Sequence, residues 1–212
     1  MGEPGEGRSG RSLNGLQALI ARAGGFDKGT GKGRGPAPVE KWNPDFCGDL
    51  DMRIARNGMW YYLGTPIGRP ALVRLFSTIL RKDADGRTYL VTPVEKVGIT
   101  VDDAHFIAVE MHAEFRNGEQ VLTFRTNVDD VVEAGPDHAI RFELEGDNGG
   151  VKPYLSVRGR LEALLARSVM YELVGLGEEI EVDGVAMFAV RSKGAVFPIM
   201  AVGELDRLTE AS

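Results

Sequence analysis

The chain has 212 residues with a formal net charge of −6, and 43% of its residues are hydrophobic. This composition is typical of a soluble globular protein with one or two domains. Its apolar runs are much shorter than the roughly 20 residues that span a bilayer, and its first residues lack the apolar core of a signal peptide. We therefore expect a cytoplasmic protein.

The distribution of charge and the cysteine content exclude further classes. Residues 1–41 hold 7 Lys/Arg and 4 Asp/Glu, which leaves 18 basic against 27 acidic residues in the rest of the chain. Nucleic-acid-binding domains usually show an excess of basic residues, so we expect no direct binding of polymeric nucleic acid. The single cysteine, Cys47, rules out an internal disulfide and any cysteine-cluster metal site.

Residues 1–38 are predicted to form a flexible, glycine-rich tail with one short helix. Ser12 suits the N-cap of this helix, leucines at helical spacing follow it, and Gly24-Gly25 suits its end. A helix this short is not stable alone in water. We therefore expect it to dock on the rest of the chain or on a partner.

A first hairpin is predicted around Asn57-Gly58, because this dipeptide favours tight turns between strands. Its strands cover residues 50–56 and 59–63. In the register of a two-residue loop, Trp60 and Tyr62 lie on the face opposite the core. This aromatic face suits a ligand or another domain.

A helix follows from Pro70 to Leu80, with apolar residues at the spacing of one buried stripe. Strands are predicted over 89–93 and 94–101. A second hairpin, 105–115 with 120–126, has Asn117-Gly118 at its turn, and a two-residue loop sets Glu110 opposite Arg125.

The remaining residues repeat this order of a hairpin, a helix and further strands. They predict a hairpin over 140–145 and 151–157, a helix over 160–174, and strands over 179–182, 185–191 and 195–202. The sequence therefore predicts an α+β fold with two structurally related halves, each a hairpin, one helix and further antiparallel strands. We expect the domains to cover residues 39–135 and 136–212, and the second helix to correspond to the first.

Arginines around the two predicted helices are the main candidates for binding, because guanidinium groups suit phosphates and carboxylates. Intramolecular ion pairs explain arginines on an acidic protein equally well. Glu95 and Lys96, next to a proline turn, suit either a ligand or a solvated strand corner. The aspartates of Val101-Asp102-Asp103 and Val128-Asp129-Asp130 suit Mg²⁺ or, more commonly, turns.

Two segments carry a family resemblance: residues 63–76, with Gly64-Thr65-Pro66-Ile67-Gly68-Arg69-Pro70, and Thr92-Pro93-Val94-Glu95-Lys96. Later blocks, Phe124-Arg125-Thr126-Asn127-Val128-Asp129 and Pro153-Tyr154-Leu155, extend it, so that it covers residues 42–202. Together they resemble the bacterial domain-of-unknown-function 1285 (DUF1285) family.

The resemblance implies a duplicated α+β core, a second half similar to pleckstrin-homology folds, and no established reaction. It also implies a nucleotide-like ligand between the halves and a role in signal transduction. We expect no metal and no cofactor. The site residues that we expect, with the aromatic pair added from the hairpin, are Arg69, Arg74, Glu95, Lys96, Arg125, Asn127, Asp129, Trp60 and Tyr62.

Three functions remain in competition. The first is a non-enzymatic sensor that binds a nucleotide-like or other anionic small molecule. The second is a protein-protein interaction module, and the third is a metal-assisted hydrolase or transferase that uses Glu95 with Asp102 and Asp129.

Overall fold

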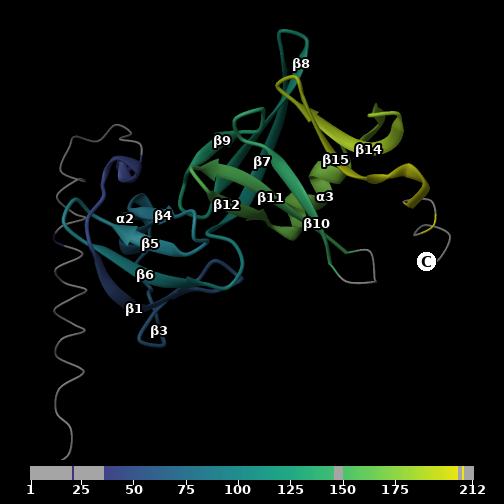
Figure 1. Ribbon diagram of the computed structural model, residues 1–212. Helices are drawn as coiled ribbons and strands as arrows, with labels where there is room; N and C mark the ends of the chain where they lie inside the picture. Colours follow the sequence, from purple (N-terminus) through teal and green to yellow (C-terminus); the bar gives the residue numbers. More distant parts are fainter. Residues whose placement is uncertain (1–20, 22–35, 146–149, 205–206, 208–212) are drawn as a thin grey trace, which may run out of the picture. The chain divides into compact units, whose positions relative to one another are not determined.

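The computed structural model describes residues 21, 36–145, 150–204 and 207 (Figure 1). Most of the tail, including its predicted helix and the glycine-rich segment after it, falls outside this part. None of the helices in the described ranges is long and apolar enough to cross a membrane.

The chain divides into two compact units at a different position from the one expected. Unit 1 comprises the residues up to Arg53 together with Trp60–Thr100, and unit 2 comprises Ile54–Met59 together with the residues from Val101 onward. The sequence placed the boundary at 135/136 instead. The reason for the difference is that strands over 106–133 pair with strands over 140–165 in one sheet, so the two segments cannot belong to separate domains.

Unit 1 is built on one sheet with the strand order β3-β2-β1-β6-β5-β4. Its elements are η1 (Val39–Lys41), β1 (Phe46–Ile54), β2 (Trp60–Tyr62), β3 (Thr65–Pro66), α2 (Pro70–Thr78), β4 (Leu80–Lys82), β5 (Thr88–Val91) and β6 (Lys96–Val101). The predicted first helix is confirmed, although it ends before β4. Arg81 therefore lies on a strand and not on the helix.

The first hairpin has a three-residue loop instead of the predicted two-residue loop. The Gly58 N–H donates to the carbonyl of Ala55 at 2.8 Å, and the Ala55 N–H donates to the carbonyl of Met59 at 2.9 Å. Gly58 adopts the left-handed region, with φ of 78°, which glycine does without strain. The extra loop residue shifts the register by one position.

That shift moves the predicted binding face into the core, because a one-residue slip turns every side chain to the other face of the sheet. Trp60 and Tyr62 are only 2% and 8% exposed. The Trp60 ring stacks on Phe76 of α2, with centroids 6.2 Å apart. The two aromatic rings therefore stabilise unit 1, and the prediction that they form an open stacking surface is wrong.

Unit 2 contains a sheet with the order β10-β11-β12-β7-β8-β9 and a smaller sheet with the order β13-β14-β15. The elements are β7 (Phe106–Arg116), β8 (Glu119–Thr126), β9 (Val131–Glu133), β10 (Ile140–Glu145), β11 (Gly150–Arg158), β12 (Leu161–Leu165), α3 (Arg167–Val174), β13 (Glu178–Val182), β14 (Val185–Ser192) and β15 (Ala195–Ala201).

The hairpins of unit 2 follow the sequence patterns closely. Glu110 pairs with Arg125 across β7 and β8, as predicted. The Asn117-Gly118 turn has φ of 55° and 85°, which is the geometry of the two-residue turn that this dipeptide favours. The β10–β11 pair and the strands of the third sheet are confirmed as well.

The predicted second helix is wrong over its first part. Leu161–Leu165 is strand β12, and only Arg167–Val174 is helical. In β12, Leu161, Ala163 and Leu165 are buried and the residues between them are half-buried. Because this apolar run lies between two neighbouring strands, its alternation is weak and its leucines also fit a helical spacing.

The two larger sheets share one topology, which confirms that the chain has two related halves. The elements that correspond between the halves differ from the predicted ones. Each consists of two three-stranded meanders, and the first strand of one meander lies beside the last strand of the other. β12 and β7 run parallel. β1 and β6 also run parallel, because Asp45 and Ile54 accept hydrogen bonds from the N–H groups of Lys96 and Asp102 respectively. The strands repeat, whereas the helices do not. The pleckstrin-homology likeness of the second half stays a prediction.

Candidate functional site

The predicted site residues lie on elements of both units, and helix α2 of unit 1 holds the first pair. Arg69 is the N-cap of α2 and Arg74 lies in its middle, and both are exposed. α2 has no capping side chain at its N-terminus.

The Thr92-Pro93-Val94-Glu95 segment is the turn between β5 and β6. The Thr92 N–H donates to the carbonyl of Glu95 at 2.9 Å, and the Glu95 N–H donates to Oγ1 of Thr92 at 3.2 Å. Thr92 is fully buried. The threonine of this motif therefore stabilises the turn that brings Glu95 and Lys96 to the start of β6.

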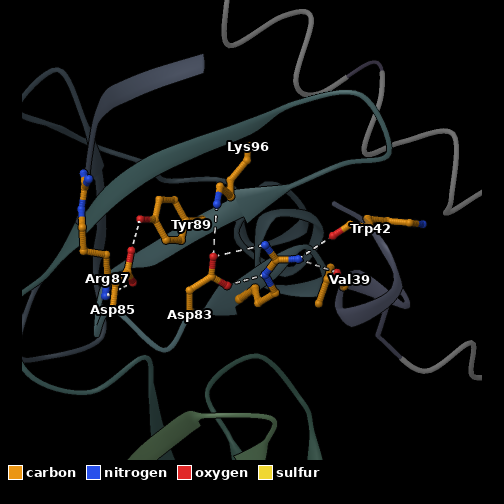
Figure 2. Close-up of polar contacts among 8 residues, drawn as sticks. Val39, Trp42, Asp83, Asp85, Arg87, Tyr89 and Lys96 are labelled. Atoms are coloured by element: carbon orange, nitrogen blue, oxygen red, sulfur yellow. Dashed lines mark hydrogen bonds and ion pairs between the residues drawn. The ribbon is translucent and has the colours of Figure 1, made fainter. Parts of the chain in front are cut away.

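Lys96 and Asp83 belong to a compact ion-pair cluster (Figure 2), in which Arg81 is the second cation that binds Asp83. Arg81 is 7% exposed. Its Nη1 donates to the carbonyls of Val39 at 2.9 Å and Trp42 at 2.7 Å, while Nε and Nη2 donate to the Asp83 carboxylate at 2.6 and 3.2 Å. Lys96 Nζ lies 3.3 Å from the same carboxylate. Burial raises the pKa of Asp83, but its bonds to Arg81 and Lys96 outweigh burial and hold the pKa below 3.8.

Tyr89 extends the same cluster (Figure 2). Its hydroxyl donates to Asp85 at 2.6 Å, which raises the pKa of Tyr89 and lowers that of Asp85. The charged groups of Lys96 and Arg87 lie over its ring at 4.7 and 5.5 Å from the centroid. Because Arg81 binds the Val39 and Trp42 carbonyls, this cluster holds the η1 segment on the sheet, and Asp83 compensates the charges of Arg81 and Lys96. The cluster is a poor candidate for a ligand site.

Arg125 and Asp129 come together in unit 2. Arg125 binds Glu110 through two nitrogens and lies 3.1 Å from Asp129. The bond from Arg125 lowers the pKa of Glu110. Two carboxylates therefore compensate the Arg125 charge.

Asn127 ties three segments together. Its Oδ1 accepts the N–H of Ile107 at 3.0 Å, its own N–H donates to the Ile107 carbonyl at 2.8 Å, and its Nδ2 contacts the carbonyl of Gly58 at 3.4 Å. A Cβ on Gly58 would lie 2.7 Å from Ile107 and 2.8 Å from Asn127. Asn127 therefore holds the tip of the β1–β2 hairpin against β7.

The aspartates that suited Mg²⁺ also have internal partners. Asp103 accepts a hydrogen bond from Tyr154 at 2.7 Å and lies 3.5 Å from Lys152. Asp130 is paired with Arg158. Within the described ranges, no group of three or more His, Cys, Asp or Glu side chains is placed to hold a metal ion.

A pocket of about 560 Å³ lies within unit 2, between the β1–β2 hairpin tip, β11, β12 and the start of α3. The side chains that line it include the cations Arg56, Lys152 and Arg167 and the apolar Ile107, Leu164 and Met170. No Asp or Glu is among the described residues that line the pocket, although the chain has 31 of them. This pocket is therefore a basic patch on an acidic protein.

The two arginines of the described lining, Arg56 and Arg167, differ from the arginines described above. Arg56 makes no hydrogen bond or ion pair with any described residue. Arg167 donates from Nε to the Tyr171 hydroxyl at 3.0 Å and lies over the Tyr171 ring, and it contacts no carboxylate in the described chain. Such guanidinium groups have donors ready for an anion.

α3 begins at the same pocket. Its N-cap is Ala166, which lines the pocket and supplies no capping side chain. The N–H groups of a helix's first turn carry partial positive charge, so this end of α3 adds to the field of Arg56 and Arg167, whereas the charge of Lys152 is compensated by Asp103.

Sequence reasoning missed this pocket. Arg56 was assigned to a strand and Arg167 to the middle of a helix, whereas they lie on a hairpin tip and at a helix start. The one sequence feature that could have indicated the pocket is Arg56, because it directly precedes the predicted Asn57-Gly58 turn. Nothing in the sequence spacing relates residue 56 to residues 152 and 167.

Two family models match consecutive parts of the chain. The model described as the N-terminal domain of unknown function DUF1285 matches residues 37–104, and that of the DUF1285 C-terminal domain matches residues 105–199. The junction between them lies close to the division between the two units. No curated protein matches the chain.

Two crystal structures of DUF1285 family proteins are similar to this chain. That of the protein from Silicibacter pomeroyi DSS-3 is 50% identical, covers 89% of this chain and 98% of its own, and superposes with a TM-score of 0.76. That of the protein from Shewanella baltica OS155 is 27% identical, with coverages of 59% and 91% and a TM-score of 0.47. The resemblance in the sequence is confirmed, and this chain belongs to the DUF1285 family.

Proposed function

We propose that this protein is a non-enzymatic cytoplasmic sensor that binds an anionic small molecule in the pocket of unit 2 and serves in signal transduction. The observation that carries the proposal is a pair of arginines, Arg56 and Arg167, that have no carboxylate partner among the described residues, at a pocket whose described lining contains no acidic side chain.

The size of the pocket supports a small molecule. Its volume of about 560 Å³ falls within the range of roughly 300–1,000 Å³ that is usual for ligand pockets. Its lining is also of the usual kind, since apolar side chains surround a few polar groups that orient a ligand. A positive pocket in a negative protein concentrates anions locally.

A library of small organic anions, including nucleotides, tests the proposal by thermal shift. A ligand at a hundred times its Kd stabilises a protein by about 2.7 kcal/mol, which corresponds to a shift of about 5–10 °C for a chain of this size. Calorimetry then gives the affinity of each compound that stabilises the protein.

Variants of the two pocket arginines test whether a compound binds in this pocket. Arg56→Gln and Arg167→Gln are each expected to weaken a compound's binding at least tenfold, because a charge-assisted hydrogen bond contributes about 1.5–3 kcal/mol. Arg160→Gln is the matched control, since Arg160 is exposed in the turn before β12 and does not line the pocket. If no anion stabilises the protein, or if both pocket variants bind as tightly as the control, the proposal is wrong.

A further inference from the structure

We propose that the ligand of this pocket is a soluble aliphatic acid, a hydrocarbon chain that ends in a carboxylate or phosphate, rather than a nucleotide. This inference rests on the proposed function, because it assumes that the pocket binds an anion. It adds the chemistry of the rest of the ligand.

The floor of the pocket is aliphatic. Leu164 of β12 is paired with Ile107 of β7, so their side chains lie next to each other on one face of the sheet. Both line the pocket, and both are half-buried. Branched apolar side chains of this kind contact hydrocarbon well and offer no hydrogen bond.

The helix wall combines one cation with one flexible apolar side chain. Arg167 and Met170 are three residues apart on α3, so they lie on the same side of the helix, and both line the pocket. Methionine adapts its shape to irregular apolar ligands. An anionic head at Arg167 would therefore have a matching apolar surface beside it.

The pocket is poorly suited to a nucleobase. Recognition of a base relies on stacking with aromatic rings and on hydrogen bonds to the base edge. Tyr171 is the only aromatic residue among the described side chains of the lining. Its ring is already covered by the Arg167 guanidinium at 5.7 Å, and its hydroxyl accepts a bond from the same side chain.

Asn57 and Tyr171 are also the only uncharged polar side chains of the described lining. A nucleobase would therefore leave most of its polar edge without partners, and unpaired buried polar groups reduce affinity. A hydrocarbon chain has no such groups. The combination of basic residues and an aliphatic floor thus fits an acid with an apolar tail.

Calorimetry with a ladder of straight-chain acids tests this inference on the full chain. Butyrate, hexanoate, octanoate and decanoate are titrated below their micellar concentrations, with octanol, octyl phosphate and AMP as comparisons. Each buried methylene is expected to raise affinity by up to about fourfold. Octanol should bind at least tenfold more weakly than octanoate, because it lacks the charge.

The variants separate the two parts of the ligand. Arg167→Gln should weaken every acid by a similar factor and leave the gain per methylene unchanged. Met170→Gln should reduce the gain per methylene while leaving butyrate nearly unaffected. Arg160→Gln should change neither quantity.

The outcomes are distinguishable. If AMP binds more tightly than every acid, or if affinity does not depend on chain length, the aliphatic inference is wrong while the proposed function stands. Sedimentation with vesicles of anionic phospholipid, without binding of decanoate, would assign the surface to a membrane and also overturn the inference. If neither the acids nor AMP nor the wider anion library binds, both proposals fall.

Discussion

Arg81 is expected to hold the segment before β1 on the sheet of unit 1, and its replacement by Met tests this role. Arg81→Met keeps much of the side-chain volume and removes the guanidinium. The Val39 and Trp42 carbonyls then lose their hydrogen bonds from Arg81, and the Asp83 carboxylate keeps Lys96 as its one basic partner among the described residues. Every partner of Arg81 is therefore affected at once.

The magnitude follows from burial. Removing one member of a buried ion pair costs about 3–5 kcal/mol. The Arg81 side chain is 8% exposed and that of Asp83 is 24% exposed, so solvent and Lys96 compensate part of the loss. We expect a loss of about 3 kcal/mol from the free energy of unfolding, at the lower end of that range.

Urea denaturation measures this loss. With a slope of about 2 kcal/mol/M, the midpoint for unit 1 should fall by about 1.5 M. Amide exchange at Ala37 and Trp42 should accelerate in the same variant, because their hydrogen bonds to Thr78 and Val39 hold the same segment.

A control variant gives the comparison. Arg69→Met removes an exposed arginine from the same unit and should change stability by no more than about 0.5 kcal/mol. If Arg81→Met costs less than about 1 kcal/mol, or if amide exchange before β1 is unchanged, the assigned role is wrong.

Three further predictions concern single contacts. Because the pKa of Asp83 is lowered from 3.8 in the folded protein, its ionised form adds stability that is fully present above this value and is lost as the pH falls below it. The stability gap between wild type and Asp83→Asn should therefore stay constant at neutral pH and narrow only when the pH falls below about 4. Gly177→Ala should cost about 1–3 kcal/mol in denaturation, because the new Cβ would lie 2.1 Å from the Phe188 ring, and the cost should shrink in a Phe188→Leu background. Asn127→Asp should remove the Nδ2 contact to Gly58 and increase amide exchange at Gly58 without unfolding the unit.

The sequence predicted the strands best where local chemistry decides the structure. The Asn117-Gly118 hairpin and its Glu110–Arg125 pair were found from two residues, because the turn alone determines that register. The same dipeptide at Asn57-Gly58 led to a wrong register. There Gly58 packs against Ile107 and Asn127, which are distant in sequence. The loop is one residue longer than predicted, and a local sequence pattern does not contain this contact.

The candidate site was less predictable for a related reason. A family resemblance selected Arg125, but whether an arginine is available depends on carboxylates brought near it by folding. Glu110 was recognisable as a partner from the strand register, whereas Asp129 lies in a turn beyond the strand. Arg56 and Arg167 stand out only after the fold shows that they share a pocket.

The pairing of first and last strands has a consequence for how each unit folds. The hairpin contacts within each meander join residues close in sequence, so these contacts form early at a small cost in chain entropy. The central parallel pairs, β1 with β6 and β7 with β12, join residues such as Ile107 and Leu164 that are far apart in sequence. These pairs close the largest loops, and we infer that they form last and determine the folding rate. The floor of the pocket lies on one of them, so the binding surface is completed only when its unit has finished folding.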